Sequence, residues 1–419
     1  MTDEEFGVTP SRRSFLSTGA IAGWGAATAF GLAGLARAEA GGQRADNRPD
    51  QATPATDTPH GGDTIAFYGE HQPGVDTPAQ AHANFVALEL DDDIDKEGLR
   101  RLMRILTDDA ARLMAGRGAL ADSEPELAAF PSRLSVTFGF GPEFVRRAGG
   151  QGPGWLRPLP KFKVDRLEPE WSGGDLFLTI GSDDPTALSH ATRMLLKDTR
   201  SFATVKWIQP GFRHARDTLA PGTTMRNLFG QVDGTVNASA GTPEFARQVW
   251  IPTGPFAGGT GVVVRRIRMD LDTWDEVDPA AREHSIGRRI DNGAPLTGKH
   301  EQDEPDFAAV TESGFPVISQ FAHMRRARSD DPRHKIVRRG YNYEVPVLAG
   351  QKDASGIGTD AGLIFVAYAA DVDVQFVPIQ RRLDEADLLN TWTTPIGSAV
   401  FVIPPGCKKG GYIGETLLE

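Results

Sequence analysis

The chain has one cysteine, Cys407, among its 419 residues. A single thiol cannot form an internal disulfide, and it excludes zinc and iron–sulfur sites that are built from several cysteines. Positive charge is also in deficit, because 45 lysines and arginines face 56 aspartates and glutamates, which gives a formal net charge of −11. This deficit argues against a protein that grips nucleic acid.

The N-terminal apolar run, residues 15–35, is only weakly hydrophobic because it is rich in alanine and glycine. It follows Arg12 and Arg13 and precedes the small-residue motif at 36–38, an arrangement typical of a signal peptide. The paired arginines followed by Phe-Leu resemble the twin-arginine type, so we expect residues 1–38 to direct export to the periplasm, the cell surface or the medium. A retained membrane anchor is the alternative, since the run is just long enough to span a bilayer.

Residues 39–63 are mostly Pro, Thr, Asp and Gly, and they predict a disordered linker. The remaining length is too great for one ordinary core, so we expect two packed units, at 64–220 and 221–419. An exported chain with one cysteine has to gain its stability from packing or from a bound cofactor.

The first unit shows strand and helix patterns in the order β-α-β-β-α-β, which is the ferredoxin-like order. The expected strands are 84–90, 134–140, 175–181 and 205–209, and the expected helices are 96–114 and 185–198, with Asp184 as N-cap.

The second unit repeats the element order without repeating the sequence. Its expected elements are a strand at 261–269, a helix at 274–286, a long loop at 287–306, a strand at 363–368, a helix at 374–389 interrupted near Pro378, and a strand at 399–403. The fold class is therefore expected to be α+β, with antiparallel sheets and peripheral helices.

The stretch 226–237 places Asp233 between Gly230 and Gly234, next to the apolar residues Leu228, Phe229 and Val232. Such a segment can present a carboxylate on a stiff loop, in a position to transfer protons. An ordinary hairpin turn with Asp-Gly at its tip is the other interpretation.

The stretch 321–343 places His323 just before a series of arginines. A neutral imidazole is a good ligand for haem iron, and the arginines would match the haem propionates. A structural histidine beside a solvated basic face explains the same residues.

Three motifs together resemble the dye-decolourising (DyP-type) haem peroxidases. Gly230-x-x-Asp233-Gly234 resembles the GxxDG motif of that family, 323–327 resembles its proximal histidine segment, and 337–341 resembles its L-R-R-G-Y segment. With the export signal, the chain is most similar to the A-type branch, which includes an exported deferrochelatase/peroxidase.

The resemblance implies two ferredoxin-like domains of the dimeric α+β barrel type and one b-type haem per chain. It implies that His323 binds the iron, that Asp233 is the catalytic acid/base and that Arg338 stabilises charge on the same face of the haem. Gly234, Thr235 and Val236 would lie along the haem edge. After Ala327 the chain departs from the family pattern, so both Arg328 and Arg333 compete for one haem contact.

The implied activity is reduction of hydrogen peroxide through a ferryl intermediate, with dyes, phenolics or other one-electron donors as reductants. Release of iron from intact porphyrin, with an iron-uptake system as a partner, and haem carriage without turnover are the alternatives. Surface electron relays through Tyr341, Tyr343, Tyr368 or Trp392 compete with a plain core role for the same residues. A homo-oligomer stays open.

Overall fold

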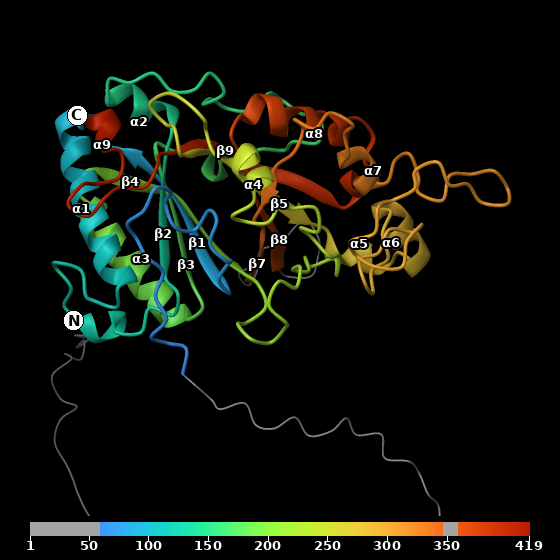
Figure 1. Ribbon diagram of the computed structural model, residues 1–419, viewed down its shortest axis with the longest axis horizontal. Coiled ribbons are helices and arrows are strands. Elements are labelled where there is room, and N and C mark those ends of the chain that lie inside the picture. Colours follow the sequence, from blue (N-terminus) through green and yellow to red (C-terminus); the bar gives the residue numbers. More distant parts are fainter. Residues whose placement is uncertain (1–58, 347–358) are drawn as a thin grey trace, which may run out of the picture. The chain divides into compact units, whose positions relative to one another are not determined.

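A computed structural model describes residues 59–346 and 359–419 (Figure 1). The predicted signal peptide, 1–38, lies outside these ranges, as does most of the predicted linker, 39–63. Within the described ranges, no helix has the length and hydrophobicity needed to cross a membrane.

The last residues of the predicted linker are placed against the folded body. Ser132 donates its backbone N–H to the carbonyl of Gly61 at 2.9 Å, and Arg133 donates to that of Asp63 at 2.7 Å. The ordered chain therefore begins before the expected start at Thr64.

The first half has the expected order of strands and long helices. It contains β1 (His82–Leu90), α1 (Lys96–Met114), β2 (Ser135–Phe140), α2 (Pro142–Arg147), β3 (Leu176–Ser182), α3 (Pro185–Thr199) and β4 (Ala203–Phe212), with short 3-10 turns η1 (Pro125–Ala128) and η2 (Pro169–Trp171). The strands pair antiparallel in the order β2-β3-β1-β4. Asp95 caps α1 by accepting from Gly98 N at 2.8 Å, and Asp184 caps α3, as the sequence predicts for this helix.

The second half has more elements between its strands. It contains α4 (Pro243–Val249), β5 (Thr260–Met269), α5 (Leu271–Asp275), α6 (Pro279–Ile286), α7 (His323–Ala327), β6 (Val337–Arg338), β7 (Tyr341–Pro346), β8 (Thr359–Ala369), α8 (Val372–Ala386), η3 (Leu388–Thr391), β9 (Thr393–Ile403) and α9 (Glu415–Leu418). Its main strands pair in the order β9-β5-β8-β7. This matches the order β4-β1-β3-β2 of the first half, with β5, β7, β8 and β9 in the places of β1, β2, β3 and β4.

The two half-sheets join into a closed ring. β2 meets β9 at the pair Phe140↔Val402, and β4 meets β7 at the pair Phe212↔Asn342. Each seam therefore joins the second strand of one half to the last strand of the other. The α+β barrel of two ferredoxin-like halves is confirmed, while the boundary at 220/221 stays a prediction.

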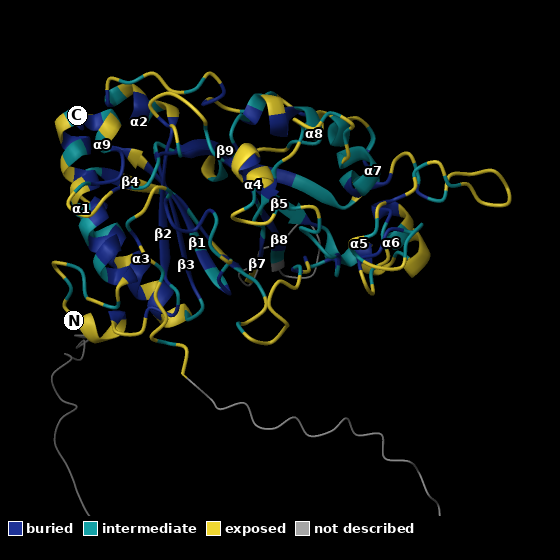
Figure 2. Ribbon diagram, viewed as in Figure 1, coloured by how far each residue is buried: buried dark blue, intermediate teal, exposed yellow. Residues whose placement is uncertain are grey.

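Alternate side chains of the strands fill two different cores. Phe85 on β1, Val264 on β5 and Phe401 on β9 belong to a cluster inside the ring, whereas Val86 belongs to the cluster beneath the outer helices. Because both faces are covered, β2 and β3 are buried along their whole length (Figure 2).

Two predicted helices in the second half are wrong in detail. The helix expected at 274–286 is broken into α5 and α6, because Asp278 caps a new helix whose first residue is Pro279. The helix expected at 374–389 begins at Val372, ends at Ala386 and is not interrupted at Pro378, which lies inside it. A proline removes one helical hydrogen bond, and the packing of Phe376 and Val377 in the core is enough to keep this helix whole.

Candidate active site

Asp233 lies just beyond a tight turn. Arg226 and Val232 form an isolated antiparallel bridge, and Gly230 closes the turn by donating to the carbonyl of Asn227 at 2.9 Å. Gly230 has φ +77°, a conformation that favours glycine. Asp233 donates its own N–H to Met225 O at 2.8 Å, so the Asp-Gly pair follows the base of the turn and does not form its tip.

An apolar cluster holds this turn in place. Phe229 is 3% exposed and stacks on Trp274 with ring centroids 4.5 Å apart. Leu389, which belongs to η3, is part of the same cluster. The cluster therefore fixes the Asp233 turn relative to a segment more than 150 residues later in the chain.

The carboxylate of Asp233 pairs with Arg338 on β6. Arg338 Nη1 lies 2.9 Å from Asp233 Oδ1, and both side chains are partly exposed, at 25% and 18%. Asn237 fixes the backbone of Arg338 from both sides: its Nδ2 donates to Arg338 O at 2.6 Å and its Oδ1 accepts from Arg338 N at 2.9 Å. The structure thus brings together Asp233 and Arg338, the two residues for which the resemblance implies catalytic roles.

The three residues after Asp233 have different surroundings. Gly234 has φ +125°, which a residue with a side chain rarely adopts. Thr235 Oγ1 donates to Glu301 Oε1 at 2.8 Å, whereas Val236 is 67% exposed. Glu301 also accepts from Thr224 Oγ1 at 2.7 Å, so it ties both ends of the segment together.

His323 is the first residue of α7 and has a buried carboxylate as its partner. Its Nδ1 lies 2.6 Å from Asp387 Oδ2, and Asp387 is 3% exposed. When the ring is neutral and Asp387 is ionised, Nδ1 carries the hydrogen of this bond, which leaves Nε2 with its lone pair. Burial opposes charge on the ring, but attraction to Asp387 and the hydrogen bond outweigh it and raise the pKa of His323.

The His323 and Asp233 sites act on each other. Arg338 lowers and Asp233 raises the pKa of His323 through their charges. The side chain of His323 is 31% exposed although its partner Asp387 is buried. Its Nε2 forms no hydrogen bond with any described residue. An open imidazole nitrogen therefore lies within electrostatic range of the Asp233–Arg338 pair.

Arg288 lies within electrostatic range of two other arginines, Arg338 and Arg328. Burial and repulsion by Arg338 and Arg328 lower the pKa of Arg288, while Glu301 opposes this shift. Arg328 pairs with Glu304, whereas Arg333 pairs with its neighbour Asp331 at 2.7 Å and is 72% exposed. Of the two arginines that the sequence left in competition, Arg328 lies on the side of the other site arginines and Arg333 extends into solvent.

These donors fit a haem. Haem iron needs a neutral imidazole nitrogen, which His323 Nε2 would offer. The two propionates need cations, which Arg288 and the two arginines that repel it, Arg328 and Arg338, would offer.

The aromatic residues proposed as relays are mostly buried. Tyr341, Tyr343 and Tyr368 are at most 2% exposed, and burial raises the pKa of Tyr368 to about 12. Trp392 is half-buried and meets Trp274 edge-on, with ring centroids 5.1 Å apart. Of the four residues, only Trp392 has a partly exposed side chain.

Sequence reasoning did not single out Asp387, Asn237, Glu301 or Arg288. Asp387 follows His323 by 64 residues, and its only local signal is that of a cap, since its Oδ1 accepts from Leu389 N at 3.0 Å. Asn237 belongs to the motif segment, but the role of its amide depends on β6, which the sequence did not predict. These partners are defined by tertiary contacts.

Comparisons with known proteins agree with this geometry. The family model "Dyp-type peroxidase, N-terminal" matches residues 72–213, and "Dyp-type peroxidase, C-terminal" matches residues 224–408. The chain is 36% identical to the dye-decolorizing peroxidase of Thermobifida fusca over 83% of this chain and 84% of that protein. It is 34% identical to the deferrochelatase of Yersinia pestis over 84% of each.

A solved structure extends the likeness to the fold. The DyP-type peroxidase from Cellulomonas bogoriensis matches with a TM-score of 0.82 and 47% identity, over 86% of this chain and 100% of that chain. The two family models, the relatives and the barrel lead to one conclusion: the chain belongs to the DyP-type peroxidase family and is a haem-dependent oxidoreductase that acts on hydrogen peroxide.

Proposed function

We propose that Asp233 transfers the protons of peroxide reduction, that Arg338 stabilises the charge that develops, and that His323 would bind the haem iron. One observation supports all three roles: the Asp233–Arg338 ion pair and the open Nε2 of His323 lie within electrostatic range of each other.

When bound, haem would supply the redox chemistry: together with outside donors it would provide the two electrons that convert hydrogen peroxide and two protons into two waters. Arg338 donates to Asp233 Oδ1, which leaves Oδ2 to accept a proton from one oxygen of hydrogen peroxide. Asp233 then returns that proton to the departing oxygen. The guanidinium of Arg338 stabilises the negative charge on the breaking O–O bond.

The acid/base residue also predicts the pH range of activity. An aspartate titrates near pH 4 when unperturbed, whereas a histidine titrates near 6.5. We therefore expect peroxide turnover to be fastest in acid. Bulky dyes would deliver electrons at the surface, and Trp392, in contact with Trp274, is the entry point that we propose.

The first test is an absorption spectrum of the haem-loaded protein before and after one equivalent of hydrogen peroxide. Wild type is expected to show a Soret band that shifts with peroxide, and His323→Ala is expected to lose that band or change it grossly. His334→Ala is the matched control, because His334 lies in the neighbouring polar loop and bonds Ser329 Oγ at 2.9 Å. A normal spectrum in His323→Ala would disprove the ligand assignment.

Release of iron from haem is the second candidate function, because relatives at 31–34% identity bear the name deferrochelatase. It would make this chain a source for an iron-uptake system. Incubation with haem and fluorescence detection of metal-free porphyrin separates the two activities. Haem carriage without turnover is disfavoured, because a carrier needs neither Asp233 nor Arg338.

Export by the twin-arginine route also belongs to the proposal. Its support is the sequence around Arg12 and Arg13, which lies outside the described residues. Replacing both arginines with lysine should leave the full-length precursor in the cytoplasm, whereas a processed wild type should be found in the periplasm or medium. A wild-type chain that keeps its N-terminus in the membrane fraction would favour the anchor.

A further inference from the structure

A β-hairpin projects from the second half and takes no part in the site. We call residues 306–317 the arm. Its strands pair through the bridge Val310↔Pro316, and Thr311 donates its N–H to Phe315 O at 2.8 Å. Gly314 closes the turn with φ +82°. These bonds show that the arm is an ordered element.

The base of the arm is fixed to α7. Arg325 Nη1 donates to the carbonyls of Phe307 and Ile318 at 3.1 and 3.0 Å, one on each side of the hairpin. The guanidinium also lies over the Phe307 ring, 5.2 Å from its centroid. The arm is therefore anchored at both ends.

The tip of the arm exposes apolar side chains to solvent. Phe315 is 70% exposed and Val310 is 61% exposed. Figure 1 shows the arm as the orange loop that extends farthest from the sheet, and Figure 2 shows its tip as exposed. Single exposed apolar residues are ordinary, but two on an ordered projection that nothing covers are typical of an interaction surface.

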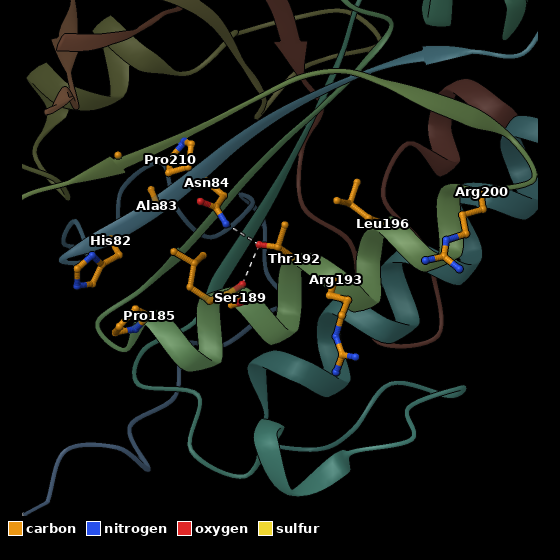
Figure 3. Close-up of a pocket in the computed structure, with 12 residues that line it drawn as sticks. His82, Ala83, Asn84, Pro185, Ser189, Thr192, Arg193, Leu196, Arg200 and Pro210 are labelled. Atoms are coloured by element: carbon orange, nitrogen blue, oxygen red, sulfur yellow. Dashed lines mark hydrogen bonds between the residues drawn. The ribbon is translucent and has the colours of Figure 1, made fainter. Parts of the chain in front are cut away.

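A groove of about 490 Å³ lies on the first half, between α3, the start of β1 and the end of β4 (Figure 3). Its apolar lining includes Leu188, Leu196 and Pro210, and its polar lining includes Arg193, Arg200 and His82. No carboxylate lines it. Arg193 pairs with Glu124 at 2.8 Å. The guanidinium of Arg200 forms no hydrogen bond or ion pair with the described residues.

The arm and the groove complement each other in chemistry. The arm tip carries Phe315 and Val310 together with the exposed carboxylate of Glu312, and the groove carries apolar walls with an unpaired guanidinium at Arg200. Figure 1 places α3 and the arm on opposite sides of the folded body, so the arm of one molecule cannot enter its own groove.

We propose that the arm of one copy of this chain docks in the α3 groove of a second copy. The contact uses two different surfaces, so it is head-to-tail: it closes into a ring if the rotation between copies permits and otherwise extends as a chain. Docking would also brace α7, because the base of the arm is bonded to Arg325, two residues after His323.

Sedimentation velocity of the haem-loaded full chain over a range of concentrations tests the proposal. Wild type is expected to associate, and Phe315→Ser and Arg200→Glu are each expected to weaken association at least about tenfold, which corresponds to about 1.4 kcal/mol. Phe130→Ser is the matched control, because Phe130 is 65% exposed but belongs neither to the arm nor to the residues that line the groove. The Soret spectrum and melting temperature show that each variant is folded.

Two further experiments are specific to a head-to-tail contact. Mixing Phe315→Ser with Arg200→Glu leaves one intact arm facing one intact groove, so the mixture should form a 1:1 complex that grows no further. The charge swap Glu312→Arg with Arg200→Glu should restore association that either change alone removes.

Three results would overturn the proposal. They are a wild type that stays monomeric up to about 100 µM, an oligomer unaffected by Phe315→Ser, and a mixture of the two variants that forms no complex. An oligomer that persists in both variants would show that the copies associate through another surface.

Discussion

The two halves of the barrel have the same strand order but use their connections differently. Between β1 and β2 the first half has one long helix, α1, which packs Leu99, Leu102 and Leu106 against the sheet. Between β5 and β6 the second half has α5, α6, the arm and the five-residue α7 that begins at His323. The equivalent connection therefore carries a core helix in the first half and the His323 segment in the second.

This difference shows where a scaffold can accept chemistry. The ring fixes the ends of each connection, and the connection is free to hold irregular backbone and partly exposed polar groups. In the first half His190 and Asp122 form a buried pair, with 2.8 Å between Nε2 and Oδ2. In the second half His323 and Asp233 each bond one partner through one side-chain atom, and their other polar atom has no partner among the described residues.

The contrast between the two halves would be wrong if a substitution in the Asp233 turn lowered stability and left catalysis unchanged, as a core substitution does. We expect Asp233→Asn to lower kcat/KM for peroxide by about 10²–10⁴, the usual contribution of a proton-transfer group, with folding unchanged. Stopped-flow kinetics measures the rate, and Asp217→Asn, at an aspartate 61% exposed, is the control. A decrease below about tenfold would assign proton transfer to another group.

The converse experiment is a cavity in the first half. Leu102 on α1 is fully buried, so Leu102→Ala should lower the free energy of unfolding by about 2–5 kcal/mol. Peroxide turnover per bound haem should not change, because α1 supplies no group to the site. Denaturant unfolding and steady-state kinetics on the same sample check both statements; a parallel loss of turnover would show that the halves are not separable in this way.

The partner of His323 offers a finer test of the second half. Asp387→Asn keeps the shape but removes the charge that orients Nδ1–H, and such changes lower metal affinity or activity by about 10–100-fold. Haem titration and kcat/KM report the two effects separately. Glu385→Gln is a suitable control, because Glu385 is 65% exposed and pairs with Arg326. Equal values for wild type and Asp387→Asn would make this hydrogen bond purely structural.

The smallest effect is expected from a carboxyl group in the first half that has no cation partner. Burial and repulsion by Asp109 raise the pKa of Asp198 to about 7, and its Oδ2 is buried with no hydrogen-bond partner among the described residues. The native state therefore keeps a proton that the unfolded chain releases near pH 4, so this group lowers stability as pH rises from about 4 to about 7. Asp198→Asn should melt a few degrees above wild type at pH 8 and level with it at pH 4, with turnover unchanged.

Local signals were sufficient for the regular elements of the first half. The prediction of 96–114 for α1 is confirmed, because the apolar spacing lies within the helix and its N-cap, Asp95, immediately precedes it. The start of α3 is confirmed for a similar reason, since Asp184 and Pro185 occupy adjacent positions. In the second half the same capping signal, Asp278 followed by Pro279, starts a separate helix, so the single helix expected at 274–286 is wrong.

The site could be predicted only as far as its motifs extend. Asp233, His323 and Arg338 stand in motif segments, and the structure places them within range of one another. Asp387, Arg288 and Glu301 are ordinary residues in their local sequence, and only the closed ring brings them to the site. The departure from the family pattern after Ala327 left Arg328 and Arg333 equivalent until their surroundings were known.

The ring also sets the order in which the chain can fold during synthesis. β4 ends at Phe212, so the first half-sheet is complete when only half of the chain has been made. β9 spans Thr393–Ile403 and is the last strand to emerge, yet it lies between β5 and β2. The barrel therefore cannot close until the ribosome has nearly finished the chain. Until then the newly made His323 segment lies beside a half-sheet that is still open. Closure of the barrel therefore sets the earliest moment at which a finished haem site can exist.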